Sequence, residues 1–124
     1  MPTDFTIALS HRPGTLAGAS AALGNAGVNI EGACAYVCDD QGIFHVLAAD
    51  TEGARRAFID AGFDILAERP VVLSSVEDRP GAGAALLRRV AEMGVNIDLL
   101  YLTRDGRLVL GGDDPGGIRR ALGS

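Results

Sequence analysis

The sequence predicts an α+β fold in which two similar halves follow one another along the chain. The main observation is an internal repeat: residues 12–30 begin with Arg-Pro-Gly and end with Gly-Val-Asn-Ile, and residues 79–97 do the same without a gap. Eight of these nineteen aligned positions are identical, mostly turn and helix-exit residues, so coincidence is a poor explanation. Each half also alternates strand-like and helix-like patterns. A solenoid needs about three or more repeats, so two copies predict two small globular domains, residues 1–69 and 70–124.

The first half contains four strand patterns and two helix patterns. Residues 5–10 alternate large apolar side chains with small ones, as in a half-buried strand. The Ala-rich residues 15–26 predict a helix, which Gly27 is expected to end in the left-handed conformation. The remaining elements are predicted as strands at 28–37, 43–49 and 63–69, a hairpin turn at 39–42, and a helix that Asp50 caps and Gly62 ends.

The second half repeats this order with one strand fewer. Its predicted elements are strands at 71–76, 95–103 and 107–111, and helices at 82–93 and from 115 onward, the latter capped by Asp114. The order strand, helix, strand, strand, helix, strand defines a split βαβ arrangement, whose antiparallel sheet carries both helices on one face. The sequence therefore predicts two ferredoxin-like βαββαβ sandwiches, the second lacking its last strand. We expect the open edge to be covered by a strand of the first domain or of another chain.

The composition excludes several classes of partner and location. The net charge is −5 and the eleven basic residues are scattered, whereas binding to nucleic acid calls for clustered basic side chains. No apolar run approaches the roughly eighteen residues of a membrane span, and the N-terminal residues lack the basic start and apolar stretch of a secretory signal. The sequence therefore predicts a cytoplasmic protein that binds neither nucleic acid nor membrane.

Candidate catalytic and metal-binding residues are few. Cys34 and Cys38 would lie on one face of a strand about 13 Å apart, too far for a disulfide, and two ligands alone rarely hold zinc. We expect both to be buried, reduced thiols. His45 lies within a predicted strand, where a partly buried structural imidazole is more common than a functional one, and no nucleophile is placed predictably beside it or His11. The sequence predicts neither an enzyme nor a metal site.

A nucleotide cofactor is not expected either. Gly81, Ala82 and Gly83 follow a predicted strand and precede a helix, but the third glycine of the dinucleotide-binding motif would fall at Leu86. The chain contains no lysine, which a phosphate-binding loop of the GxxxxGK[ST] type requires. We therefore predict no cofactor.

The repeated Arg-Pro-Gly lies between a strand and the start of a helix. The first amides of a helix are unpaired and the helix dipole favours an anion, so a carboxylate or phosphate could bind there. Gly14 and Gly81 lack a Cβ, which would let a ligand approach the main chain. A tight turn that needs proline and glycine explains the same residues, and local physics alone favours that explanation. Asn29 and Asn96 are similarly open to two interpretations, a ligand contact or a polar residue closing a turn.

The motifs Arg-Pro-Gly-Thr-Leu and Gly-Val-Asn-Ile, separated by one helix in this order of elements, resemble those of ACT domains. The resemblance covers nearly the whole chain and is that of a tandem pair of ACT domains. Such domains regulate amino-acid metabolism, for example in phosphoglycerate dehydrogenase and aspartate kinase. The resemblance implies a non-catalytic regulatory or sensor protein, expected to form a homodimer, with a small metabolite, typically an amino acid, bound where two ACT domains meet.

The resemblance also implies which residues contact the ligand. They belong to the loop after the first strand of one domain and to the second strand of its neighbour: His11, Arg12, Pro13, Gly14, Thr15, Leu16, Asn29 and Ile30 in the first copy, and Asp78, Arg79, Gly81, Ala82, Asn96 and Ile97 in the second. Two positions depart from the family pattern. His11 replaces the usual Asp or Asn that Asp78 keeps, and Gly83 replaces the leucine that Leu16 keeps. We therefore expect two unequal sites, with His11 making one of them sensitive to pH.

Two other functions fit the same sequence. The fold could serve only as an interaction module that dimerises or docks on a metabolic enzyme without a ligand. A cofactor-less enzyme is the third alternative, and the sequence disfavours it because no catalytic constellation is evident.

Overall fold

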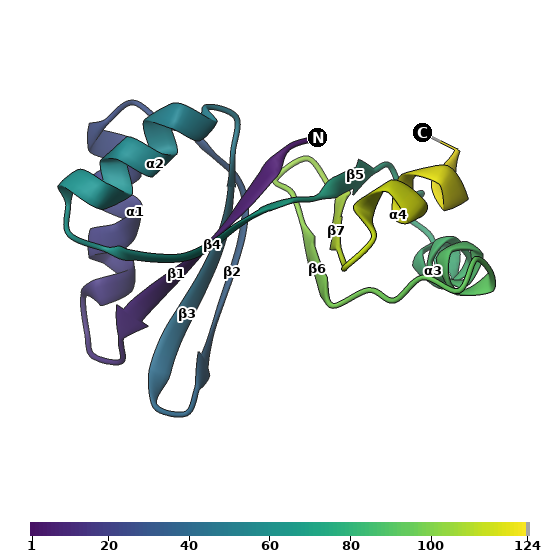
Figure 1. Ribbon diagram of the computed structural model, residues 1–124, viewed down its shortest axis with the longest axis horizontal. Helices are drawn as coiled ribbons and strands as arrows, with labels where there is room; N and C mark the ends of the chain where they lie inside the picture. Colours follow the sequence, from purple (N-terminus) through teal and green to yellow (C-terminus); the bar gives the residue numbers. More distant parts are fainter. Residues whose placement is uncertain (124) are drawn as a thin grey trace. The chain divides into compact units, whose positions relative to one another are not determined.

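The computed structural model describes residues 1–123, which form an α+β protein with four helices and two antiparallel sheets (Figure 1). Apart from Met1, the contacts divide the chain between Arg69 and Pro70 into two compact units, which we describe separately. The elements of the first unit are β1 (Thr3–Ser10), α1 (Thr15–Asn25), β2 (Ile30–Cys38), β3 (Gln41–Ala48), α2 (Thr51–Asp60) and β4 (Asp64–Pro70).

The four strands of the first unit form one sheet in the order β2-β3-β1-β4, which is the order expected of a ferredoxin-like sandwich. Strand β3 runs antiparallel to both β1 and β2. Helices α1 and α2 lie on one side of this sheet (Figure 1). Apolar side chains of β1, β3 and both helices form the core between the two layers, with Phe5, Ile7, Leu23, Val46 and Phe58 among its largest buried members.

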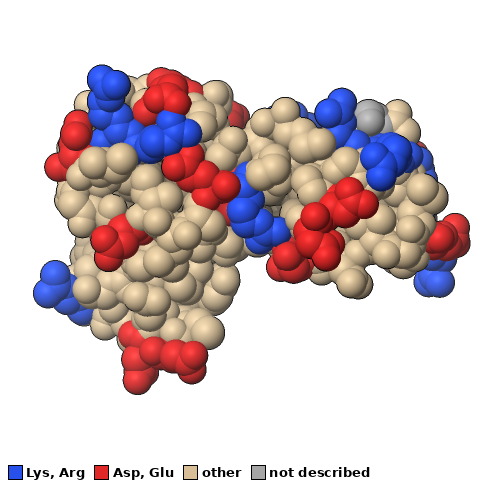
Figure 2. Space-filling view, viewed as in Figure 1, with Lys and Arg blue, Asp and Glu red and all other residues tan. Residues whose placement is uncertain are grey.

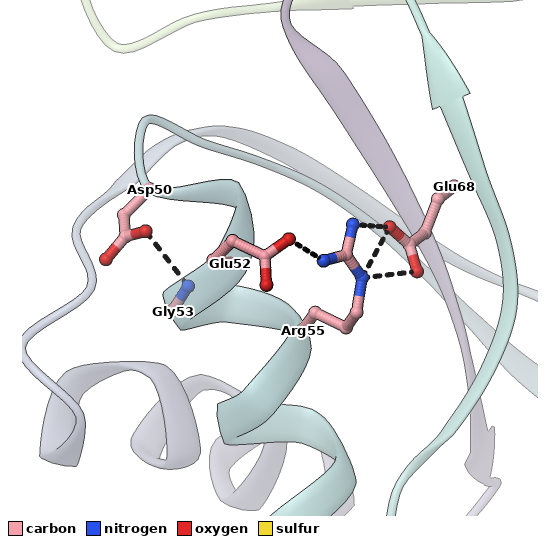
Figure 3. Close-up of polar contacts among 5 residues, drawn as sticks. All are labelled: Asp50, Glu52, Gly53, Arg55 and Glu68. Atoms are coloured by element: carbon pink, nitrogen blue, oxygen red, sulfur yellow. Dashed lines mark hydrogen bonds and ion pairs between the residues drawn. The ribbon is translucent and has the colours of Figure 1, made fainter.

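The ends of the first-unit helices have clear physical causes. Gly14 precedes α1 with φ 93° and Gly27 follows it with φ 74°, a left-handed conformation that glycine adopts without a steric penalty. Asp50 caps α2 by accepting a hydrogen bond from the Gly53 amide at 2.9 Å (Figure 3). The expected capping residue of α2 and the expected left-handed glycine after α1 are therefore both confirmed.

An exposed ion-pair network joins α2 to β4 (Figure 3). The guanidinium of Arg55 donates from Nη2 to Glu68 Oε1 at 2.6 Å and from Nε to both carboxylate oxygens at 3.0 Å, and it also pairs with Glu52 one helical turn earlier. The view in Figure 2 shows these basic and acidic groups interspersed over α2. The hydrogen bonds from Arg55 lower the pKa of Glu68.

The second unit repeats the arrangement with three strands. Its elements are β5 (Val72–Ser74), α3 (Ala82–Glu92), β6 (Leu99–Leu102), β7 (Leu108–Gly111) and α4 (Pro115–Leu122). The sheet order is β5-β7-β6, with β7 antiparallel to both neighbours, so β5 is an edge strand of this sheet within residues 1–123. Val72, Leu86, Val90, Leu110 and Ile118 form a separate core. Asp114 caps α4 by accepting from the Gly117 amide at 2.9 Å.

Two strands of the second unit are shorter than the sequence predicts. The expected strand 71–76 contains only the three residues of β5, and the expected strand 95–103 contains only the four residues of β6. Val95 and Ile97 pack against the core although they lie outside a strand, so their alternating burial imitates a strand pattern. The sequence pattern therefore predicted the burial of Val95 and Ile97 correctly but overestimated the length of the paired strands.

Candidate functional site

A recess of about 360 Å³ lies at one end of the first unit. One side is lined by the end of β1, the following loop and the start of α1, which are residues 9–16. The other side is lined by residues 35–37 near the end of β2 and residues 42–43 at the start of β3. All six loop residues expected from the family resemblance in the first copy, residues 11–16, therefore border one recess. Leu9, Leu16, Ala35 and Val37 give it an apolar lining.

The loop is held by hydrogen bonds to its own main chain. The Arg12 amide donates to the Ser10 carbonyl at 2.9 Å. The Thr15 hydroxyl lies 2.6 Å from the same carbonyl and 3.1 Å from that of Arg12, so it ties the first residue of α1 back to β1. Gly14 has open space where a Cβ would stand, and its positive φ is what requires glycine. The tight-turn explanation of this glycine is therefore sufficient for its presence.

The start of α1 offers positive electrostatic potential to the recess. No side chain in the described part of the chain caps the first amides of α1, and a helix start carries a partial positive charge. The lining contains Arg12 and His11 but no carboxylate. Arg12 forms no ion pair within residues 1–123 and is exposed at the rim. An anionic group fits this environment better than a cationic one.

The corresponding loop of the second unit has the same backbone but different side chains. Gly81 precedes α3 with φ 86°, and the Arg79 amide donates to the Glu77 carbonyl at 3.0 Å. Here the Arg79 side chain is already occupied, since its Nε lies 2.5 Å from the Glu77 carboxylate. Ala82 is buried and has no hydroxyl with which to brace the loop. Asp78 and Arg79 are exposed, and the side chains of the two loops therefore differ in their contacts.

The second-strand residues of the expected site lie away from the recess. Asn29 precedes β2 and Ile30 begins it, and neither belongs to the recess lining. The reason is geometric: α1 runs back along the sheet, so β2 starts at the opposite end from the loop after β1. In the second unit Asn96 and Ile97 precede β6, and Ile97 packs against the core. Within either unit these residues therefore do not face the loop, and the expected contact with the loop of a neighbouring domain stays a prediction.

Sequence reasoning missed the wall formed by β2 and β3. Gly42 pairs with both Leu9 and Val37, so the start of β3 lies between the ends of β1 and β2. The predicted hairpin and strand patterns contained this information, because the turn fixes which residues of two strands face each other. The pairing of β1 with β3, which brings this hairpin beside the loop after β1, was not predicted.

A second polar constellation lies on the sheet face opposite the helices. The Nδ1 atom of His45 is 2.9 Å from the Oδ2 atom of Asp4, and its Nε2 atom is 3.3 Å from the Tyr36 hydroxyl. Phe44 and Val46 point into the helix-covered core, so the alternation of β3 turns His45 to the other face. Tyr36 borders the recess, and its ring stacks on that of His45. Sequence reasoning anticipated a partly buried imidazole but missed both of its partners.

The two cysteines are free but differ in environment. Cys34 lies opposite His45 and is partly buried, whereas Cys38 at the end of β2 is exposed. The expectation of two buried thiols is therefore wrong for Cys38, because β2 is an edge strand that ends at the hairpin. Burial raises the pKa of Cys34, and the negative charge of Asp4 raises it further.

No group of His, Cys, Asp and Glu side chains within residues 1–123 is arranged to hold a metal ion. None of the helices in this part of the chain has the length and apolar character needed to cross a membrane.

The backbone belongs to a known structural class, because it shares its fold with regulatory subunits of aspartate kinase. The ligand-free regulatory subunit from Thermus thermophilus is 20% identical in sequence, with a TM-score of 0.68 over 98% of this chain and 89% of that one. Protein BT0572 from Bacteroides thetaiotaomicron is 23% identical, with a TM-score of 0.88 over 98% of this chain and 86% of that one. No family model matches the sequence, and no curated protein matches it significantly. At these identities the likeness is one of fold.

Proposed function

We propose that the protein is a non-catalytic regulatory module of the ACT type that binds a small carboxylate-bearing metabolite, an amino acid, in the recess of the first unit. Two arguments that do not depend on each other support this proposal. The sequence motifs resemble those of a family that includes aspartate kinase, and the fold resembles regulatory subunits of aspartate kinase. In this proposal the two units are tandem ferredoxin-like ACT lobes, the second without a fourth strand.

The recess is the observation that carries the proposal. Its volume of about 360 Å³ lies within the range of small-molecule sites, and it combines an apolar lining with few polar groups, as such sites do. A ligand carboxylate would accept hydrogen bonds from the first amides of α1 and from the Arg12 guanidinium. An apolar ligand side chain would pack against Leu9, Leu16 and Val37.

The ammonium group of an amino acid needs acceptors that the recess supplies only in part. The lining offers main-chain carbonyls and the Ser10 hydroxyl as acceptors, but no carboxylate. We place the remaining contacts on a second copy of the chain, in keeping with a homodimer whose ligand lies where two domains meet. This arrangement makes ligand binding and dimerisation mutually reinforcing.

A thermal-shift screen against the standard amino acids tests the proposal. A ligand at a hundred times its dissociation constant adds about 2.7 kcal/mol to the free energy of unfolding, so a true ligand raises Tm clearly. The variant Ala35→Leu fills the recess from an exposed strand position and should lose the shift. The matched control Ala33→Leu, on the same face of β2 but outside the recess, should keep it. No shift with any amino acid would contradict ligand binding.

The exposed edge strands favour one alternative, an interaction module that dimerises or docks on a metabolic enzyme without a ligand. Tyr36 and Val37 on edge strand β2, and Leu100 and Leu102 on edge strand β6, are large apolar residues exposed to solvent. Edge strands with apolar side chains are common sites of association. A concentration-dependent dimer that no amino acid stabilises would support this alternative.

A further inference from the structure

We propose that Tyr36 is a covalent modification site, at which the phenol accepts an acyl group from an activated acyl donor while His45 acts as general base. Asp4 is the positioning residue that orients His45. The proposal rests on the polar constellation of the sheet face and not on the ligand recess, so it stands or falls separately from the proposed function.

The hydrogen bonds define the roles of the three groups. The proposed step uses the tautomer of neutral His45 in which Nδ1, 2.9 Å from Asp4 Oδ2, donates its proton to the carboxylate. The Nε2 atom then holds a lone pair and faces the Tyr36 hydroxyl at 3.3 Å. A nucleophile, a base and a group that orients the base are thus aligned in one chain.

The register of the sheet holds the hydrogen-bonded residues Asp4, His45 and Tyr36 in place. His45 pairs directly with Thr6 on β1 and with Cys34 on β2, whereas Asp4 and Tyr36 are its diagonal neighbours on the same two strands. Asp4 is fully buried and His45 is 6% exposed, so both are confined by their surroundings. The Thr6 hydroxyl lies 3.5 Å from Asp4 and adds a further polar contact to the buried carboxylate.

The nucleophile itself remains accessible. Tyr36 is 51% exposed on an edge strand, and its ring stacks on His45 with centroids 5.9 Å apart and an interplanar angle of 26°. A reagent can therefore reach the phenol while the base stays shielded from solvent. The other tyrosine, Tyr101, is only 6% exposed and offers an internal comparison.

Cys34 and Cys38 share the Tyr36 face of β2 and are the competing nucleophiles. Cys38 is opposite Gln41 at the hairpin, away from the base, whereas Cys34 is opposite His45 in an environment that disfavours reaction. The thiolate is the reactive form of cysteine, and a pKa raised by burial and by the charge of Asp4 keeps Cys34 as the thiol. The phenol of Tyr36, by contrast, has a base aimed at its proton. The geometry therefore favours the phenol over the thiol.

The proposed step is an acyl transfer in which all atoms are accounted for. The phenolic oxygen attacks the acyl carbonyl carbon as its proton passes to His45 Nε2, the tetrahedral intermediate expels the leaving group, and the imidazolium returns the proton to it. The products are an acyl ester of Tyr36 and the free leaving group. A neutral acyl donor suits this surface better than an anionic phosphoryl donor, because Asp4 is hydrogen-bonded to His45 and the turn three residues after Tyr36 carries Asp39 and Asp40. Figure 2 shows acidic side chains gathered at the tip of the β2–β3 hairpin.

The test uses p-nitrophenyl acetate as the donor and peptide mass spectrometry to locate the acetyl group. The chain has no lysine, so the acceptors that mass spectrometry must separate from Tyr36 are the N-terminal amine, the two cysteines and the two histidines. General-base catalysis contributes on the order of 10²–10⁴-fold in enzymes, and we expect Tyr36 to react at least about tenfold faster than N-acetyltyrosinamide. Tyr101 should stay unlabelled. A Tyr36 rate equal to that of the free amide would overturn the proposal without any variant.

Two variants then assign the roles. His45→Gln should reduce the Tyr36 rate to that of the free amide, and Asp4→Asn should do so by reversing the imidazole tautomer while keeping the shape of the side chain. Asp64→Asn, an exposed carboxylate on β4, should leave the rate unchanged. Tm is recorded for each variant, and a folded His45→Gln protein that reacts as fast as wild type would refute the role of the base.

Discussion

Two arginines at equivalent positions of the repeat are in different chemical situations. Arg79 pairs with Glu77, whereas Arg12 has Ser10 at the corresponding position and no ion pair within residues 1–123. An arginine already paired gains little from a new anion, because the new contact must replace the old one. This difference of one residue, serine against glutamate, is a reason for proposing the ligand site in the first copy.

Arg12→Gln should therefore weaken ligand binding, and Arg79→Gln should not. A hydrogen bond to a charged group contributes about 1.5–3 kcal/mol, which corresponds to roughly a tenfold to hundredfold loss of affinity. Isothermal titration with the amino acid found by the screen measures both variants. Equal losses of affinity in the two variants, or a loss only for Arg79→Gln, would contradict a ligand site in the first copy.

The hydroxyl of Thr15 has a role that the alanine at the equivalent position of the second copy lacks. Thr15→Val removes the hydrogen bonds to the Ser10 and Arg12 carbonyls at nearly constant volume, so the loop should loosen and unfolding should cost about 1 kcal/mol less. Thr15→Ser, which keeps the hydroxyl, is the control. Urea denaturation measures the free energy of unfolding of both variants. A Thr15→Val protein as stable as wild type would show that these two hydrogen bonds contribute nothing to stability.

At the scale of elements, the sequence predicted those features whose cause is local. The capping side chains of Asp50 and Asp114 and the glycine after α1 follow from a few neighbouring residues. The lengths of β5 and β6 and the far wall of the recess depend on pairing between distant strands. The hydrogen bonds of His45 to Asp4 and Tyr36 could not be predicted either, because these residues come from three different strands. Local sequence patterns therefore predict helices, turns and caps, whereas sites built from several strands also require the pairing register of the sheet.

The cap of α4 can be tested directly. Asp114→Ala removes the acceptor for the Gly117 amide and should lower the free energy of unfolding by about 1 kcal/mol. Asp113→Ala changes the adjacent exposed carboxylate, which is not the N-cap, and should be nearly neutral. Chemical denaturation of both variants measures the difference. Equal effects would mean that charge and not capping is responsible.

The contact between α2 and β4 should appear in the pH dependence of stability. Because Arg55 lowers the pKa of Glu68 below 4.5, the contact stabilises the fold fully above pH 4.5 and is lost as pH falls through the lower folded-state pKa. The Tm of wild type should thus fall more steeply below pH 4.5 than that of Glu68→Gln. Glu92→Gln, an exposed carboxylate at the end of α3, should keep the wild-type slope. Parallel curves for wild type and Glu68→Gln would contradict this origin of acid sensitivity.

At the scale of the whole molecule, fold and sequence give different kinds of information. The fold is shared with the Thermus thermophilus regulatory subunit at 20% identity, although no family model matches the sequence. A shared fold with a divergent sequence is expected when glycines, helix caps and the alternation of buried residues determine the fold. The side chains of the loops then determine which ligand is bound. The duplicated loops illustrate this, because their backbones agree while their chemistry has diverged.

The most direct test of a ligand site in the first copy is a titration of the ¹⁵N-labelled protein followed by amide chemical shifts. With the amino acid identified by the screen, we expect saturable shifts at residues 14–16 and 35–37, which border the recess, and none of comparable size at residues 81–83. Shifts confined to residues 81–83, or no saturable shift at residues 14–16, would contradict it.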